Sequence, residues 1–324
     1  MKPWGFFTVL VVFGALASLG LFFFGGPERS PSEKPVMVVS AYPIFYFAEN
    51  IGGDEIRVDT ITPLGVEPHD YEPTVGERVR LERADAFVFV GGGFDPWAEK
   101  FVRSYEGTGM TIRSLLPSGE NIPAIIPKEE TLRASDEQVE EDSHNEAYDP
   151  HVWLDPMRSV MIVEELAQTM SALDPAHEVL FAERAQMLTG RLNTLHNAFE
   201  QGLSTCSTRS VIVSHNAFGY LAERYHLEMI PIAGLSPEAE ATPGTIAEVV
   251  RLARAANVTT VFFETIADPR IAETIAREIG GTTKVLNPVE NLLPEEKQNN
   301  VDYFTLMERN LANLREALSC SEII

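Results

Sequence analysis

The chain has 324 residues, a formal net charge of −23 and a hydrophobic content of 44%, which suits a globular protein of two domains. The negative charge argues against nucleic acid as a partner, because phosphate binding needs clustered lysine and arginine. An anionic surface instead repels anionic solutes and mildly concentrates cations.

The first 26 residues are expected to be either a signal peptide or an uncleaved membrane anchor. Residues 4–24 form a nearly unbroken apolar run that is long enough to span a bilayer. A small-residue cleavage signal at 15–17 lies inside this run, and three phenylalanines continue beyond it, which favours the uncleaved anchor. Either interpretation exports the rest of the chain, and residues 27–34 then form a polar linker.

Residues 35–172 are predicted to form an N-terminal α/β lobe. Short apolar strands are expected at 35–40, 56–61 and 86–90, and helices at 44–51 and 75–84. This alternation is typical of a parallel sheet flanked by helices. Residues 127–149 break the pattern, and their acidic composition predicts a surface loop.

Two long helices and a second lobe follow. Apolar periodicity predicts helices at 157–173 and 175–203, so residues 173–205 are assigned as a rigid linker helix. Residues 206–324 are assigned as a C-terminal α/β lobe, with strands at 210–214, 229–233, 259–263 and near 284–286, and helices at 218–225, 243–256, 271–279 and 302–318. Two α/β lobes with mainly parallel sheets, joined by a long helix, predict a ligand site in the cleft between them.

Three of the seven histidines, His69, His151 and His215, share a context. Each lies at or beyond the end of a predicted strand or in the loop that follows, and ligands of open α/β sheets bind outside the carboxyl ends of strands. Prolines flank His69 and His151 and restrict the backbone of both loops before a ligand arrives. Together the three histidines favour a binding site over three separate structural roles.

Four motifs carry a resemblance to a known family. They are Pro68-His-Asp-Tyr-Glu-Pro73, Asp149-Pro-His-Val-Trp-Leu-Asp-Pro156, Val213-Ser-His-Asn-Ala-Phe-Gly-Tyr220 and Leu286-Asn-Pro-Val-Glu290. Over roughly residues 35–318 the chain resembles the cluster A-I solute-binding proteins of ABC importers for zinc and manganese. The resemblance implies an extracytoplasmic protein that captures Zn²⁺ between two lobes and delivers it to an ABC permease. We expect it to be a monomer.

The resemblance also implies a set of metal ligands. In this family the histidines of the first two motifs bind metal, and they correspond to His69 and His151. The third position is His in zinc-type members and often Glu in manganese-type members, so His215 points to Zn²⁺, which suits three imidazoles. Many members have an aspartate where this chain has Asn287, a poor zinc ligand. Zinc-type members with a Leu-Asn-Pro-x-Glu sequence use the glutamate, which is Glu290 here.

Several alternatives stay open. Glu264 or a water could supply the fourth ligand, although the expected role of Glu264 is to orient a histidine or to pair with Arg270. His144, in the acidic loop, is either a weak auxiliary ligand or part of a solvated loop. The alternative functions are a Mn²⁺-binding protein of the same fold and a surface adhesin.

Two kinds of chemistry are not expected. The sequence has no His-Glu-x-x-His helix, nucleophile elbow or phosphate-binding glycine loop, so a zinc hydrolase or other enzyme is not predicted. Cys206 and Cys320 lack the spacing of a zinc knuckle. A disulfide between them is permitted in an exported chain, and the sequence leaves it open.

Overall fold

The computed structural model describes residues 34–107, 109–118, 123–128, 131–132, 148–235, 242–266 and 268–321. The expected anchor at residues 4–24 and most of the acidic loop, His144 included, lie outside these ranges. Within them, no helix combines the length and the apolar character needed to cross a membrane. All described residues belong to one compact unit that begins at Lys34.

The first lobe contains a sheet of four parallel strands in the order β2-β1-β3-β4. Its elements are β1 (Val36–Val39), α1 (Tyr42–Gly52), β2 (Arg57–Thr60), α2 (Val75–Leu81), β3 (Ala86–Phe89), α3 (Pro96–Ser104) and β4 (Thr111–Ser114). The central strand β3 is buried throughout, as its unbroken apolar run predicts. The sequence pattern did not predict α3 or β4, and β4 is an edge strand with a single large apolar residue, Ile112.

The second lobe repeats this strand order as β6-β5-β7-β8, again parallel throughout. Its elements are β5 (Ser210–Val213), α6 (Gly219–Tyr225), β6 (Glu228–Pro231), α7 (Pro243–Ala255), β7 (Thr260–Phe263), α8 (Arg270–Ile279), β8 (Thr282–Val285), α9 (Pro294–Gln298) and α10 (Tyr303–Ala317). Strand β8 begins two residues before the expected position, and the short helix α9 was not predicted. The predicted class, two α/β lobes with parallel sheets, is confirmed.

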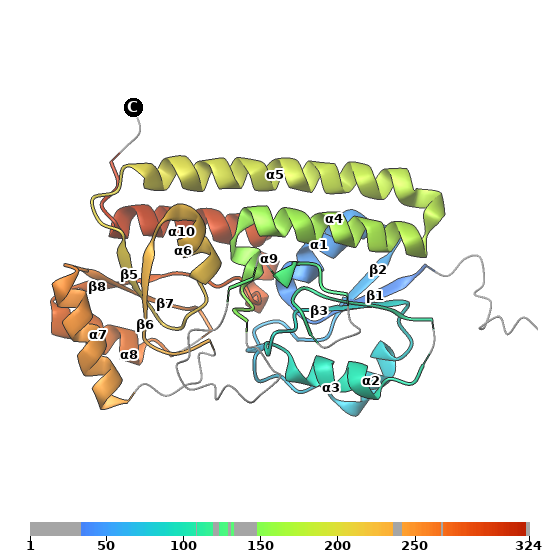
Figure 1. Cartoon of the computed structure of the whole chain (residues 1–324), viewed down its shortest axis with the longest axis horizontal. Helices are drawn as coiled ribbons and strands as arrows, with labels where there is room; N and C mark the ends of the chain where they lie inside the picture. The colour runs from blue at the N-terminus through green and yellow to red at the C-terminus, as the bar shows by residue number, and fades with distance from the viewer. Residues whose placement is uncertain are drawn as a thin grey trace, which may run out of the picture. The chain divides into compact units, whose positions relative to one another are not determined.

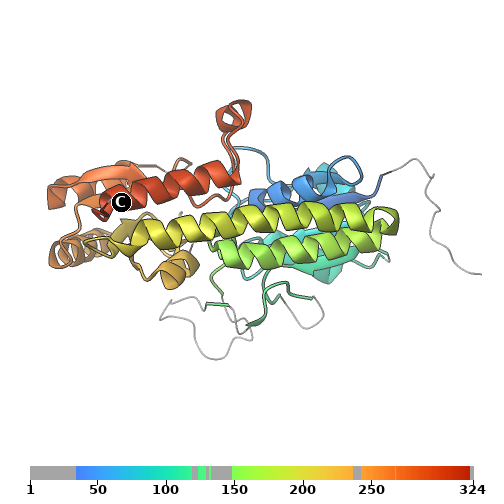
Figure 2. The ribbon, with the colours of Figure 1, turned by 90° about the horizontal axis from the view of Figure 1, so that it is seen from above.

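A pair of long helices connects the lobes. After the short turns η2 (Val152–Leu154) and η3 (Pro175–His177), which flank α4 (Pro156–Leu173), the helix α5 runs from Glu178 to Ser204. In Figures 1 and 2 it passes alongside α4 and α1 of the first lobe and α10 of the second. Its buried face is formed by an apolar series, Leu188, Leu192, Leu195 and Phe199. This single helix therefore contributes to the cores of both lobes.

Polar contacts also join the lobes near the start of α4. The indole Nε1 of Trp153 donates to the carbonyl oxygen of Pro288 at 2.8 Å, and the Tyr303 hydroxyl donates to the carbonyl oxygen of Trp153 at 2.6 Å. Asp155 is buried and accepts from Arg158 of its own helix and from Arg224 of α6, each at 2.5 Å. These contacts fix the segment that follows His151 against the second lobe.

The disulfide that the sequence left open is present, between Cys206 and Cys320. Cys206 follows α5 and Cys320 follows α10, and the two segments also form an antiparallel bridge. The bond ties the end of the linker helix to the end of the last helix.

Candidate metal centre

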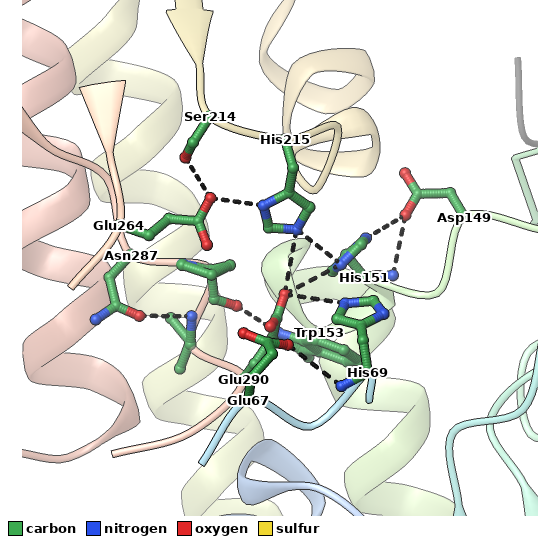
Figure 3. Close-up of polar contacts among 12 residues, drawn as sticks. Glu67, His69, Asp149, His151, Trp153, Ser214, His215, Glu264, Asn287 and Glu290 are labelled. Carbon is green, nitrogen blue, oxygen red and sulfur yellow. Dashed lines mark hydrogen bonds and ion pairs between the residues drawn. The ribbon is translucent and has the colours of Figure 1, made fainter. Parts of the chain in front are cut away.

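Four side chains converge between the two lobes (Figure 3). His69 lies in the loop after β2 and His151 directly precedes η2, whereas His215 follows β5 and Glu290 follows β8. One ligand atom from each residue lies within 4.8 Å of those of the other three. The three histidines and the glutamate favoured from the sequence are thus brought together, two from each lobe.

The spacing of the converging atoms matches a tetrahedral zinc site. Oε1 of Glu290 lies 3.6 Å from Nε2 of His69, 3.1 Å from Nε2 of His151 and 3.4 Å from Nε2 of His215. The Nε2 atoms of His151 and His215 are 3.4 Å apart. With bonds of about 2.0–2.2 Å, the ligand atoms of a tetrahedral zinc site stand about 3.3–3.6 Å from one another. A small metal ion therefore fits without a change in the backbone.

His151 is oriented by a carboxylate two residues before it. Oδ1 of Asp149 accepts from Nδ1 of the His151 ring at 2.8 Å and from its backbone N–H at 3.0 Å. Because a carboxylate can only accept, Nδ1 carries the proton and the lone pair of Nε2 points toward the other histidines. This carboxylate–histidine arrangement is common behind metal-bound imidazoles.

His215 is oriented in the same way from the second lobe. Oε1 of Glu264 lies 2.6 Å from Nδ1 of His215 and also accepts from the Ser214 hydroxyl. Glu264 therefore contacts the ring from the side opposite the cluster (Figure 3). The expectation that it orients a histidine is confirmed. The alternative pairing with Arg270 is wrong, because Arg270 binds the nearer carboxylate of Asp268.

His69 has an apolar support and a hydrogen-bonded loop. Its ring lies 4.3 Å from that of Phe94, measured between centroids. Its backbone N–H donates to Oε1 of Glu67 at 3.2 Å. The amide of Asn291 donates to the carbonyl oxygens of Pro63 and Val66, so the loop that carries His69 is bonded directly to the residue after Glu290.

Glu67 was missed by the sequence reasoning. Burial and the nearby charge of Glu290 raise the pKa of its carboxyl to about 8. Its position two residues before His69, which mirrors that of Asp149 before His151, is the one sequence signal that could have indicated it. Phe94 carries no comparable signal, because it approaches His69 only through the fold.

The charges of the cluster depend on one another. Burial opposes the charged form of Glu290, but the three histidines hold its pKa well below the ordinary value. Burial likewise opposes a charged His215, but Glu264 and Glu290 raise its pKa well above the ordinary value. The pKa of His151 is raised against the effect of burial by Asp149 and Glu290, whereas burial lowers that of His69. A metal ion must therefore displace protons from His151 and His215.

Two atoms of the cluster are buried without a hydrogen-bond partner among the described residues, Nε2 of His69 and Oε1 of Glu290. A buried polar atom without a partner is costly. Three imidazole lone pairs and one carboxylate oxygen that face the same point are mutually repulsive until a proton or a cation lies between them. The donor set, three nitrogens and one oxygen, is one that binds Zn²⁺.

Comparisons with known proteins agree with this geometry. The family model described as ZnuA, zinc-uptake complex component A, periplasmic, matches residues 37–317. The chain is 32% identical to the zinc-binding lipoprotein AdcA of Streptococcus pneumoniae over 297 residues, which are 89% of this chain and 57% of AdcA. It is also 32% identical to the high-affinity zinc uptake system protein ZnuA of Bacillus subtilis over 318 residues, or 98% of each chain.

A solved structure extends the match to the fold. The crystal structure of the Zn(II)-bound ZnuA-like domain of Streptococcus pneumoniae AdcA superimposes with a TM-score of 0.71 at 28% identity, covering 88% of this chain and 99% of that domain. The resemblance found in the four sequence motifs is thereby confirmed. Since the family model spans most of the sequence, the chain belongs to the ZnuA family of periplasmic zinc-uptake components.

Proposed function

We propose that this chain is an extracytoplasmic solute-binding protein that captures Zn²⁺ with His69, His151, His215 and Glu290. The observation that carries the proposal is the convergence of these four ligand atoms at the spacing of a tetrahedral zinc site. The carboxylates behind His151 and His215 support it, because they hold both rings with a lone pair toward the cluster. Capture is binding without chemical change, so we propose no enzymatic activity.

The donor set favours zinc over manganese. Three neutral imidazoles and one carboxylate suit the borderline Zn²⁺ ion, whereas Mn²⁺ prefers a larger share of oxygen ligands. Glu290 is engaged through Oε1, and its neighbour Asn287 uses its amide oxygen on a backbone N–H. The cluster thus offers few further oxygens for a larger coordination number.

The wider setting of the chain is proposed along the same lines. We propose that it delivers its ion to an ABC permease, acts as a monomer, and is held at the membrane by residues 4–24. We also propose that residues 35–172 and 206–324 are the two lobes and that 173–205 is the linker between them. Contacts that support the linker assignment are those of α5 with α1, α4 and α10.

The test is metal binding by the full-length chain, followed by competition with a zinc chelator and by calorimetry. One Zn²⁺ per chain is expected, with Mn²⁺ unable to displace it at equal concentration. Zinc at one hundred times its dissociation constant should stabilise the fold by about 2.7 kcal/mol. No zinc binding, or unchanged binding in a chain with both His69→Ala and His151→Ala, would refute the proposal.

A matched control uses a histidine outside the cluster. His177 lies at the start of α5, where its ring pairs with Asp174 at 2.6 Å. The His177→Ala chain loses one imidazole, as each site variant does, but should bind zinc like the unsubstituted chain. A loss of binding there would mean that histidine content, not the cluster, determines the result.

A further inference from the structure

The residue before Glu290 has an unusual backbone. Val289 has φ of 60°, in the left-handed region, and its side chain is fully buried. Five non-glycine residues among those the structure describes have a positive φ, and Val289 is the β-branched one. A branched Cβ is the least compatible with this region, since it crowds the following carbonyl. Such a conformation persists only where the surroundings impose it.

Buried amides impose it here. The amide oxygen of Asn287 accepts from the backbone N–H of Val289 at 2.7 Å. Asn310, which is 1% exposed, bonds both sides of Asn287, since its amide oxygen accepts from the Asn287 N–H at 2.8 Å and its amide nitrogen donates to the Asn287 carbonyl at 2.6 Å. Figure 3 shows the amide of Asn287 turned away from the histidines and toward its own loop.

The loop is held on both sides of Val289. Before it, the indole of Trp153 donates to the carbonyl of Pro288 at 2.8 Å, and the proline ring limits its own φ. After it, the backbone N–H of Tyr42 donates to the carbonyl of Glu290 at 3.3 Å. The left-handed residue between these anchors turns the chain so that the Val289 side chain enters the core while the Glu290 carboxylate faces the histidines.

We propose that Val289 is a positioning residue whose left-handed backbone, imposed by Asn287 and Asn310, aims Glu290 into the metal cluster. The inference rests on the proposed zinc function and deepens it. The constraint limits the conformations that Glu290 can adopt before the ion arrives, so less freedom is lost on binding. The stability given up at Val289 is thereby converted into order at the fourth ligand.

The test compares two substitutions in the full-length chain. Val289→Ala and Val289→Gly both remove the buried methyl groups, but only glycine relieves the left-handed strain and frees the backbone. The Val289→Gly chain should therefore unfold at a higher urea concentration than the Val289→Ala chain. It should nevertheless bind zinc about tenfold more weakly, the factor that corresponds to a left-handed preference of ~1.4 kcal/mol. Its Co²⁺ complex should also show weaker visible absorption, as the fourth ligand is partly lost.

This opposite order separates positioning from a structural role, which would lower stability and affinity together. The control pair is Asn257→Ala and Asn257→Gly, at a left-handed residue after α7 with φ of 54°, where stability should change and zinc affinity should not. Equal zinc affinity in the two Val289 variants, or greater stability of Val289→Ala, would overturn the proposal. No zinc binding by the unsubstituted chain would instead overturn the proposed function, and the positioning role with it.

Discussion

Glu264→Gln tests how the cluster is oriented and charged. Oε1 of Glu264 lies 2.6 Å from Nδ1 of His215, and the side chain is 3% exposed. Glutamine keeps the size of the side chain and an oxygen that can accept, but it removes the charge. It also adds an NH₂ group that can stabilise the wrong tautomer of His215. Loss of such a partner behind a metal ligand typically costs 10- to 100-fold in affinity, or about 1.4–2.7 kcal/mol.

The pH dependence sharpens this prediction. Although burial lowers it, the pKa of His215 is raised well above its ordinary value by Glu264 and Glu290, so zinc must displace a proton from His215 at neutral pH. Without the charge of Glu264, the pKa of His215 falls and this competition weakens. The affinity loss in Glu264→Gln should therefore be largest at high pH and should shrink as the pH falls.

The assay is competition against a colorimetric zinc chelator between pH 6 and pH 9, with each chelator constant corrected for pH. The control is Asp268→Asn, an exposed carboxylate that pairs with Arg270 and has no contact with the cluster. A loss that is the same at every pH, or no loss at all, would refute the assignment of Glu264 as the partner that holds His215.

Three further predictions concern stability. Asp155→Ala should destabilise the chain by about 3–5 kcal/mol in urea unfolding, because it leaves buried arginine charge unpaired, whereas Glu223→Gln, at a half-exposed carboxylate on the same arginine, should cost about 1 kcal/mol or less. A similar cost for both variants would contradict the importance of burial. Reducing Cys206–Cys320, which closes a separation of 114 residues, should lower stability by at most about 5 kcal/mol, and a chain with both cysteines changed to serine should not respond to the reductant. The metal-free chain should lose stability as the pH rises from 6.5 to 8, because the pKa values of Glu67, His151 and His215 are all raised in the fold and each group releases its proton more readily when unfolded. Urea unfolding with a chelator present checks this, and a rise in stability over that range would be inconsistent with the charges described.

The sequence predicted the elements whose burial is written in local pattern. The run at 86–90 has no polar residue, and β3 is buried throughout. The series along α5 recurs at helical spacing, and its apolar face is buried. By contrast, β4 and β8 are edge strands of four residues in which polar side chains dominate. Their pairing with a buried neighbour, not their own composition, makes them strands.

The site divides in the same way. Motifs identified the residues that converge, because each histidine stands in a distinctive local sequence. Their supports could be predicted only where they are close in sequence or follow a strand, as Asp149 and Glu264 do. The contact of Phe94 with His69 and the backbone of Val289 depend on residues brought together by the fold. No local pattern encodes them.

The central claim is that four named atoms hold one zinc ion between the lobes. The most direct measurement is a crystal structure of the zinc-loaded chain with anomalous data collected on both sides of the zinc absorption edge. The account predicts a single peak about 2.0–2.2 Å from Nε2 of His69, His151 and His215 and from Oε1 of Glu290. A peak bound by other residues, or none between these four, would contradict it.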